Sequence, residues 1–285
     1  MNVAFASVYS LKNKIDNKLQ EALDELEGEV SQLKSSCYYA IGTGGKRLRP
    51  ILVELVANAL NNSSDVTKAA LATEFFHTAS LIADDLPCMD NEDKRRGKLS
   101  LHKAFNESTS LLASYTFISL GYEYIRKNIV TLQKQNLSFS NEAFERGFLA
   151  LELVAGSAGI LGATYGQFLD LFPPNQKLET LEKIIEKKTI TLFDISFSLG
   201  WLFGGGSIAL LPKVKEAAYL FGMAFQILDD LNDIEEDDSF KNIAAVLGKE
   251  KALFLLKEKK ELLIQKLQEL GIYSETFAFL IQKAL

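Results

Sequence analysis

The stretch HTASLIADDLPCMD, residues 77–90, sets polar side chains into an otherwise apolar helical pattern. At about 100° per residue, His77 and Asp84 lie on the same stripe of that helix. Pro87 should end the helix, so we expect Asp90 to return to the site from a loop. Carboxylates at the end of an apolar helix are costly unless they are paired or bound to a metal. The DDxxxxD spacing therefore predicts a metal site at the end of a long helix.

A second acidic motif, AFQILDDLND at residues 224–233, repeats this arrangement. Gln226, Asp229 and Asp233 lie at three- and four-residue spacing, and so on one helical face. A solvated acidic surface is the alternative interpretation, and we accept it only for the acidic run at 235–238. Carboxylate oxygens suit Mg²⁺, whereas the sequence has no Cys/His cluster for zinc. The net charge of −6 argues against nucleic-acid binding, which needs a clustered basic surface.

Apolar residues recur at three- and four-residue spacing along nearly the whole chain, as in Leu11, Ile15, Leu19 and Leu23. Because we find no convincing two-residue alternation beside hairpin signals, the predicted fold class is all-α. The 285 residues include only five prolines and no linker-like stretch, which favours a single domain over residues 1–285. We expect about ten or more long helices around a central apolar cavity. Helix breaks are expected at 42–45, 61–64, 87–97, 173–174, 204–206 and 237–239.

One apolar stretch, residues 148–168, carries Glu152 as its only charge and reaches the length of a membrane span. Its many small residues permit close helix contacts, so we expect a buried central helix and no transmembrane segment. Five acidic residues within positions 16–27 argue against a secretory or transit peptide. Two cysteines without CxxC spacing favour a reducing compartment. We therefore expect a cytoplasmic protein.

Three basic clusters accompany the acidic motifs. The sequence GGKRLRP at residues 44–50 puts glycines, Lys46 and Arg49 at the start of a helix, which is a natural anion site, although a basic helix cap is the alternative. Arg95 and Arg96 follow the first acidic motif and suit bidentate phosphate contacts. Residues 187–189, Lys-Lys-Thr, open a further helix. Metal sites, phosphate sites and long apolar helices together predict two diphosphate substrates with apolar tails.

These motifs are similar to those of the trans-isoprenyl diphosphate synthases, the bacterial-type farnesyl and geranylgeranyl diphosphate synthase family. The resemblance runs from about Cys37 to Gly248 and is specific because long motifs occur in the same order. The motifs are GGKRLRP at 44–50, HTASLIADDLPCMDNEDKRRGKLSLHKAF at 77–105, GQFLDL at 166–171, KT at 188–189 and FQILDD at 225–230. The resemblance implies an isoprenoid-synthase fold, a homodimer, and head-to-tail condensation of isopentenyl diphosphate with an allylic diphosphate.

The resemblance also implies roles for residues of this chain. Three Mg²⁺ ions per active site would bridge Asp84, Asp90 and Asp229 to the allylic diphosphate. The catalytic residues that it implies are Asp84, Asp85, Asp90, Arg95, Lys188, Thr189, Gln226 and Asp229. The substrate-binding residues that it implies are Lys46, Arg49, His77, Arg95, Arg96, Lys188, Thr189, Gln226 and Lys241.

The chain departs from the family pattern at three places. Ile190 stands where the family has the glycine of a KTG motif. The loop after the second acidic motif is shortened to residues 235–242, which puts Lys241 about one position away from the family lysine. The C-terminus ends in Lys-Ala-Leu, where relatives tend to place an arginine.

The length of the product depends on residues before the first acidic motif. In this family a bulky side chain four or five positions before the motif stops the growing tail early, but here those positions are Ser80 and Ala79, which are small. Phe76 lies one helical turn deeper, about 5–6 Å further from the metals. We expect Phe76 to form the floor and the product to be geranylgeranyl diphosphate, with twenty carbons. If Phe76 is an ordinary core aromatic, farnesyl diphosphate is the alternative.

Two other classes share parts of this pattern. A class I terpene cyclase would have the same fold and one aspartate-rich motif, but it would lack GGKRLRP and a second DDxxD. A non-catalytic subunit would usually have lost the aspartates, and both sets are intact here. Consumption of isopentenyl diphosphate in the presence of a metal separates a synthase from a non-catalytic subunit.

Overall fold

The computed structural model describes residues 3–26, 29, 31–234 and 240–285, and this part of the chain is helical apart from one small hairpin. The expected all-α class is confirmed. The helices are α1 (Val3–Asp24), α2 (Gln32–Gly42), α3 (Leu48–Ala59), α4 (Thr67–Asp84), α5 (Leu101–Ala104), α6 (Glu107–Lys134), α7 (Ala143–Ala158), α8 (Ala163–Leu171), α9 (Leu178–Ile184), α10 (Thr191–Phe203), α11 (Leu211–Asn232), α12 (Ile243–Leu247), α13 (Lys249–Glu269) and α14 (Glu275–Ala284). The hairpin pairs β1 (Lys94–Arg95) with β2 (Lys98–Leu99), and short turns are η1 (Ser140–Glu142), η2 (Ile185–Ile190) and η3 (Ile208–Leu210).

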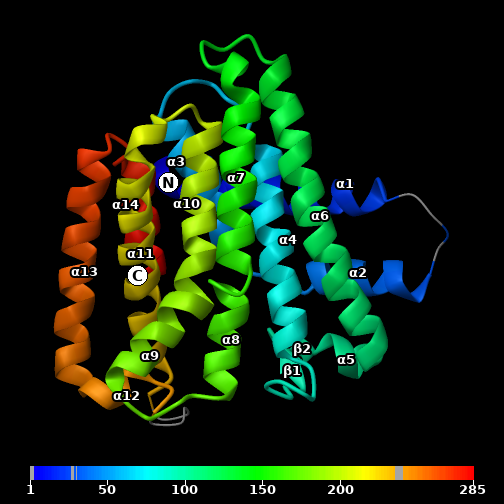
Figure 1. Ribbon diagram of the computed structural model, residues 1–285, viewed down its shortest axis with the longest axis vertical. Coiled ribbons are helices and arrows are strands. Elements are labelled where there is room, and N and C mark those ends of the chain that lie inside the picture. The colour runs from blue at the N-terminus through cyan, green and yellow to red at the C-terminus, as the bar shows by residue number, and fades with distance from the viewer. Residues whose placement is uncertain (1–2, 27–28, 30, 235–239) are drawn as a thin grey trace.

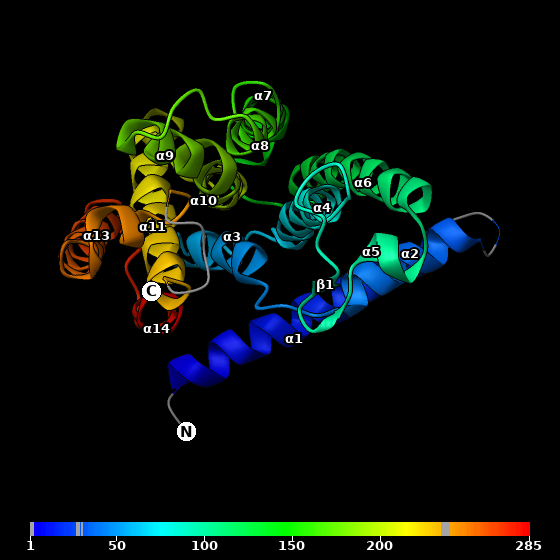
Figure 2. The same cartoon turned by 90° about the horizontal axis from the view of Figure 1, so that it is seen from below.

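The long helices run side by side and pack mainly in neighbouring pairs. Figure 1 shows α3, α4, α6, α7, α10, α11 and α13 along the length of the molecule, and Figure 2 shows α1 lying across one side of this bundle. The closest pairs are α4 with α6, α11 with α13, and α10 with both α3 and α11. Fully buried phenylalanines fill the space between them, at positions 75, 117, 193, 197, 203, 221 and 277. The last turns of α4 and α11 lie at the same end of the bundle, so the two acidic motifs face a common region.

Polar caps define where several of these helices begin. The side chain of Ser31 accepts a hydrogen bond from the backbone of Lys34, and Asn106 does the same for Thr109. Such caps satisfy backbone N–H groups that have no partner inside the helix. The bounds of α2 and α6 therefore follow from local sequence.

The expected central helix over residues 148–168 is wrong in two respects. The chain leaves helical geometry after Ala158 and resumes at Ala163, because Gly162 turns so tightly that a Cβ there would lie 1.9 Å from the carbonyl oxygen of Ser157. Side chains on both sides of the break are exposed, including Phe148 at 70% and Ile160 at 79%. The region Ser140–Leu171 is long and apolar enough to cross a membrane, but only 33% of its most apolar window is buried inside the protein.

Most predicted helix breaks agree with the structure. Loops separate helices around residues 43–47, 60–66, 85–100, 172–177 and 204–207. The break expected at 237–239 falls outside the described residues. The β1–β2 hairpin within the loop at 85–100 was not expected, because each of its strands has only two residues and no alternation to detect.

Candidate active site

An apolar cavity of about 600 Å³ begins at the first acidic motif and runs along α4. Its walls come from α4, α6, α7 and α8, with Leu192 of α10. Asp84 lines its polar end, and Ala79 and Ser80 leave space along its length. The predicted central apolar cavity is therefore present beside the motif.

The candidate floor residue is held in place by two residues of α6. The tip of the Phe76 ring lies against Gly121, where a Cβ would come within 2.5 Å of it. The same ring meets Tyr122 edge to face at 5.2 Å between centroids. Both Phe76 and Tyr122 line the cavity. An aromatic barrier thus lies where the sequence places the floor.

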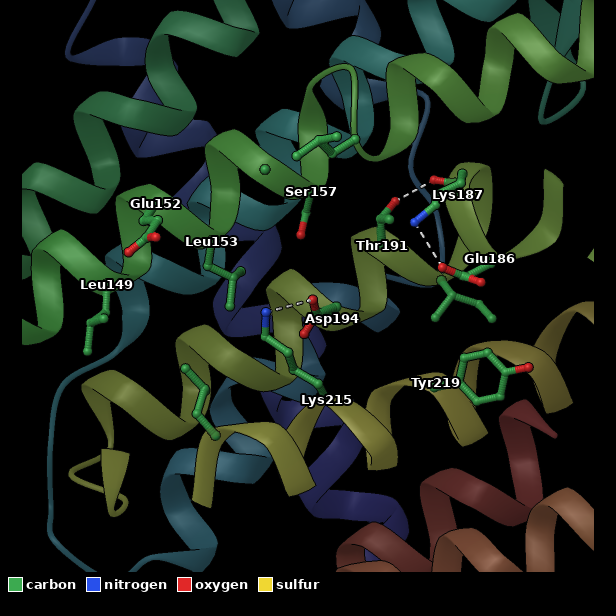
Figure 3. A pocket seen from close by; sticks show the side chains of 14 residues that line it. Leu149, Glu152, Leu153, Ser157, Glu186, Lys187, Thr191, Asp194, Lys215 and Tyr219 are labelled. Atoms are coloured by element: carbon green, nitrogen blue, oxygen red, sulfur yellow. Dashed lines mark hydrogen bonds and ion pairs between the residues drawn. The ribbon is translucent and has the colours of Figure 1, made fainter. Parts of the chain in front are cut away.

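A second cavity of about 820 Å³ lies on the other side of α7, between α7, η2, α10 and α11. Figure 3 shows Asp194 and Lys215 facing one another there, with Nζ and Oδ2 3.7 Å apart. Burial raises the pKa of Asp194, and this outweighs the opposing effect of Lys215. None of the predicted site residues lines this cavity, so it is separate from the candidate active site.

The first acidic motif forms a tight turn at the end of α4. The backbone N–H of Asp90 donates to the carbonyl oxygen of Asp84 at 2.9 Å, which confirms the return of Asp90 from a loop. Burial raises the pKa of Asp84 to about 6, and the described residues offer its carboxylate no hydrogen bond or salt bridge. A half-buried carboxylate in this state favours the arrival of a cation.

Asp85 has a different environment from Asp84, although the two are adjacent. Its side chain is 3% exposed and accepts hydrogen bonds from Nε of Arg95, at 2.9 Å, and from Nη2 of the same residue. Both bonds end on Oδ1, and they fix the guanidinium beside the acidic motif. Asp85 therefore holds Arg95 in position, and its expected catalytic role stays a prediction.

The two aspartates of the second acidic motif differ in exposure. Asp229 is exposed at the end of α11, whereas Asp230 is 3% exposed. Asp230 Oδ1 accepts from the Gln226 amide at 2.7 Å, and Oδ2 accepts from the backbone of Ile243 at 2.7 Å. The Thr189 hydroxyl donates to the Gln226 carbonyl oxygen at 2.9 Å. Asp230, which the sequence analysis did not single out, thus fixes the orientation of Gln226.

Two lysines converge on Asp170, a residue that the sequence analysis did not identify as part of the site. Nζ of Lys188 lies 2.6 Å from Asp170 Oδ2 and 3.8 Å from Asp90 Oδ2. Nζ of Lys241 lies 3.4 Å from Asp170 Oδ1. Burial opposes the charge of Lys188, but the nearby carboxylates, Asp170 foremost, raise its pKa. The structure therefore brings Lys241 to the site despite its shifted position in the sequence.

A π-helical turn sets the direction of Lys188. Residues 185–190 form this turn, η2, between α9 and α10. Gly166 of α8 packs directly against its backbone, because a Cβ there would come within 2.2 Å of the Lys188 nitrogen. Single π-helical turns are frequent at functional sites. Ile190, which replaces the family glycine, lies buried at the end of the turn.

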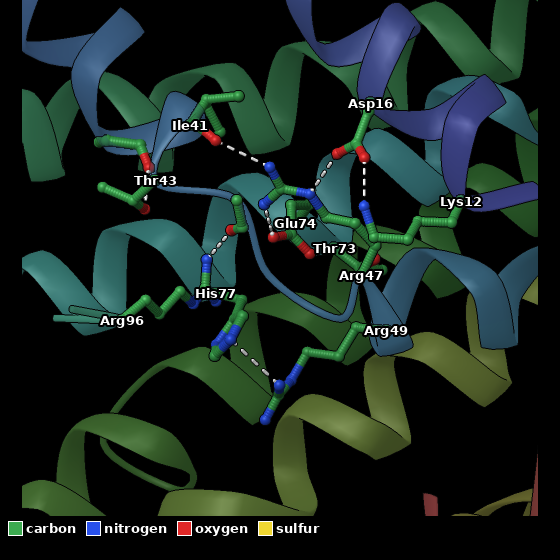
Figure 4. A network of polar contacts seen from close by, with 12 residues as sticks. Lys12, Asp16, Ile41, Thr43, Arg47, Arg49, Thr73, Glu74, His77 and Arg96 are labelled. Atoms are coloured by element: carbon green, nitrogen blue, oxygen red, sulfur yellow. Dashed lines mark hydrogen bonds and ion pairs between the residues drawn. The ribbon is translucent and has the colours of Figure 1, made fainter. Parts of the chain in front are cut away.

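Basic side chains from the start of α3, from the loop before it and from the β1–β2 hairpin lie beside α4, and Figure 4 shows Arg47, Arg49 and Arg96 of this basic cluster with His77. Nη1 of Arg49 lies 3.2 Å from Nε2 of His77, and Arg96 donates to the carbonyl oxygen of Gly44. Gly45, at φ 136°, permits this approach, since a Cβ there would lie 2.6 Å from Arg96 Nη1. Lys46, from the same loop, is exposed.

Two buried nitrogens of this basic cluster have unused hydrogen-bonding capacity. Arg49 Nε and His77 Nδ1 make no hydrogen bond within the part of the chain that the structure describes. Burial lowers the pKa of Arg49 to about 10, so its guanidinium is still charged at neutral pH. Burial, together with the charge of Arg49, holds the pKa of His77 well below its usual 6.5. A charged donor and a neutral imidazole with unused nitrogens suit a bound phosphate group.

The neutral state of His77 predicts a pH dependence of stability. The unfolded chain takes up a proton on this ring as pH falls below about 6.5, whereas the folded chain does not. The unfolded state then binds more protons, so stability falls with pH below that value, by at most about 1.4 kcal/mol per pH unit from this residue. Urea unfolding at several pH values should show a shallower acid slope for His77→Gln than for the wild type. Equal slopes would mean that His77 is charged when folded.

Arg47 belongs to the same sequence motif but serves the fold. Figure 4 shows its guanidinium turned away from His77 toward Asp16 and Glu74. Nη1 lies 2.5 Å from Glu74 Oε1, Nε lies 2.8 Å from Asp16 Oδ1, and Nη2 donates to the Ile41 carbonyl oxygen at 2.8 Å. These bonds tie α1, α2 and α4 to the start of α3.

Arg47→Met is expected to destabilise the protein by about 3–5 kcal/mol, because Glu74 is 2% exposed and would be left as an uncompensated buried charge. Arg126→Met on the surface of α6 makes the same change without a buried partner and should cost within about 0.5 kcal/mol. Chemical denaturation of both variants tests this. The double change Arg47→Met with Glu74→Leu should recover part of the loss, and no recovery would contradict the ion-pair explanation.

The acidic residues fit the predicted magnesium. Among the described residues, no three His, Cys, Asp or Glu side chains gather closely enough to hold a metal ion alone. Mg²⁺ commonly binds through one or two carboxylates together with substrate phosphates. Asp84, Asp90 and Asp229 supply such oxygens at one end of the bundle, so a metal would enter with its diphosphate.

Comparisons with known proteins point in one direction. The model of the polyprenyl synthetase family matches residues 30–251. Farnesyl diphosphate synthase of Bacillus subtilis is 36% identical over 79% of this chain and 73% of its own length. Geranylgeranyl pyrophosphate synthase 4 of Arabidopsis thaliana is 33% identical over 90% of this chain, which spans 66% of that relative's length. The crystal structure of a geranyltransferase from Legionella pneumophila superimposes with a TM-score of 0.87 at 26% identity, covering 99% of this chain and 96% of the other.

Proposed function

We propose, since this chain belongs to the polyprenyl synthetase family, that it is a Mg²⁺-dependent prenyltransferase acting on isopentenyl diphosphate and an allylic diphosphate. The proposal rests on one observation. Carboxylates and a lysine lie together at one end of an apolar cavity. The Asp90 carboxylate lies 3.8 Å from Nζ of Lys188, whose charge also acts on Asp84, and the cavity of about 600 Å³ runs away from them. A diphosphate with a hydrocarbon tail matches both parts.

The allylic diphosphate would lie with its charge between the acidic motifs and its tail in the cavity. Magnesium, when bound through Asp84, Asp90 and Asp229, neutralises diphosphate charge and so assists its departure. Arg95, Lys188 and Lys241 bind the same oxygens. The bond between C1 and oxygen breaks, and its electron pair leaves with the diphosphate. The apolar walls exclude water, which would otherwise trap the allylic cation.

Isopentenyl diphosphate would bind at the basic cluster, through Lys46, Arg49, His77 and Arg96. Its double bond supplies the electron pair for a new carbon–carbon bond to C1, and loss of one proton from the adjacent carbon restores a double bond. Thr189 and Gln226, fixed by Asp230, present oxygen dipoles to the developing charge. The protein thus works by positioning and electrostatics.

The proposed product is geranylgeranyl diphosphate, with farnesyl diphosphate as the alternative. The small side chains of Ala79 and Ser80 leave the upper cavity open, and Phe76 blocks it one turn deeper. Farnesyl and geranylgeranyl synthases both occur among the relatives, so their names do not separate the two products. The position of the aromatic barrier favours the longer chain.

A homodimer is part of the proposal, supported by an exposed apolar face on α6 and α7. Tyr115 is 56% exposed, and Phe144 and Phe148 are also largely exposed. Large exposed apolar side chains on two packed helices are typical of a protein contact. Light scattering of the purified protein should give twice the chain mass, and Tyr115→Asp with Phe148→Asp should give the monomer mass. A monomeric wild type would contradict the proposal.

Product analysis tests the function. The purified chain would be incubated with Mg²⁺, isopentenyl diphosphate and each of the five-, ten- and fifteen-carbon allylic diphosphates, and the products would be sized by chromatography. We expect a twenty-carbon product, and none after chelation of the metal. Failure to condense with every starter would contradict the proposal. A cyclic hydrocarbon from the allylic substrate alone would instead indicate a terpene cyclase.

A further inference from the structure

Gln167 is a polar residue without partners inside the apolar cavity. Its Nε2 and Oε1 atoms are both buried, and neither makes a hydrogen bond within the described part of the chain. The residue lines the cavity together with Asp84 and Leu171. Buried amide groups in folded proteins nearly always have partners, and leaving one without them costs stability. Retaining Gln167 in this state points to a partner that arrives with a ligand.

The position of Gln167 along α8 shows which part of the ligand it meets. Asp170, which holds Lys188 at 2.6 Å, lies three residues further along the same helix. Three residues advance a helix by about 4.5 Å, so Gln167 lies about one turn below the diphosphate end. That depth corresponds to the first carbons of an allylic chain whose diphosphate contacts Lys188.

The other glutamine of the site provides a contrast. Gln226 already uses both ends of its amide, since its oxygen accepts from Thr189 and its nitrogen donates to Asp230. Gln167 lies on a different helix and uses neither end. A residue that only supported the fold would be expected to have bonds like those of Gln226. The amide of Gln167 is therefore free to respond to the substrate.

We propose that Gln167 is a catalytic residue that contacts the reacting carbon of the allylic substrate. As the bond between C1 and oxygen breaks, the Gln167 carbonyl oxygen faces the positive charge that develops on the allylic carbons. Its NH₂ group donates to the diphosphate oxygen that takes the electron pair. Fixed dipoles in a water-free cavity stabilise such charge separation strongly. This role rests on the prenyltransferase function proposed above.

The test combines kinetics with stability in Gln167→Leu, which keeps the approximate volume but cannot form hydrogen bonds. We expect kcat to fall about 10²-fold, the KM for isopentenyl diphosphate to stay unchanged, and the melting temperature to rise by about 1–3 °C. The rise follows because buried polar atoms without partners are removed. Gln133→Leu, the same change at an exposed position of α6, is the control and should leave all three values unchanged.

A binding measurement separates catalysis from packing. Wild-type protein with Mg²⁺ should bind a diphosphate analogue with an ammonium group in its chain more tightly than a thiolodiphosphate analogue with a neutral chain, and Gln167→Leu should lose about tenfold of that preference. A wild-type kcat in the variant, or a lower kcat with a lower melting temperature and an unchanged preference, would overturn the proposal. Gln167→Met supplies the same comparison if the leucine variant does not fold. An active wild type with an active variant overturns this role alone, whereas an inactive wild type overturns the proposed function as well.

Discussion

Asp84→Asn is expected to lower kcat for condensation by about 10³-fold while leaving the protein at least as stable as the wild type. The carboxylate lies at the mouth of the cavity, where burial raises its pKa to about 6, and no described side chain pairs with it. Keeping it charged at neutral pH therefore destabilises the empty protein, on the order of 3 kcal/mol if its whole pKa shift is counted. Binding of a metal and diphosphate reverses that cost, and asparagine cannot supply the same charge.

The neighbouring change Asp85→Asn is the matched control. Asp85 already binds Arg95 through two hydrogen bonds and is buried, so losing its charge should lower the melting temperature and leave Arg95 misplaced. Steady-state kinetics and thermal unfolding of both variants should therefore give opposite changes in stability. If Asp84→Asn keeps wild-type kcat, or melts well below Asp85→Asn, the assignment of metal binding to Asp84 is wrong.

Sequence patterns predicted the parts of the molecule that depend on local periodicity. The helical stripe of His77 and Asp84 and the loop that returns Asp90 are present because proline and a repeat of three to four act over a few residues. Roles that depend on which way one side chain turns were less predictable. Asp84 and Asp85 are the same residue type at adjacent positions, and only the tertiary neighbour Arg95 separates their roles.

The sequence analysis did not predict the contacts between distant segments. Asp170 belongs to the site because it contacts Lys188, eighteen positions later, and Lys241 beyond the second acidic motif. The break after Ala158 follows from a close approach of Gly162 to Ser157, which hydropathy does not report. A run of small and apolar residues fits a buried helix, a membrane span and an exposed contact face equally well. Packing decides among these, because only the folded structure shows which neighbours are present.

Phe76→Ala is expected to lengthen the product by at least one isoprene unit. The Phe76 ring closes the cavity against Gly121 and Tyr122, so its removal extends the space available to the tail. Ser80→Phe should do the reverse and give a product of fifteen carbons or fewer, since it places a ring one turn nearer the acidic motif. Chromatography of the hydrolysed products from one starter and isopentenyl diphosphate measures both.

Phe75→Ala is the matched control, because the ring of Phe75 faces Phe117 and Tyr124 instead of the cavity. Both alanine variants lose a buried aromatic and should be destabilised by about 3–5 kcal/mol, so a loss of stability alone affects them alike. Only Phe76→Ala should change chain length. An unchanged product from Phe76→Ala with a shortened one from Ser80→Phe would move the floor to Tyr122, since that ring would still close the cavity from α6. If Phe75→Ala lengthened the product as well, general loosening of the core, and not a specific floor, would set the chain length.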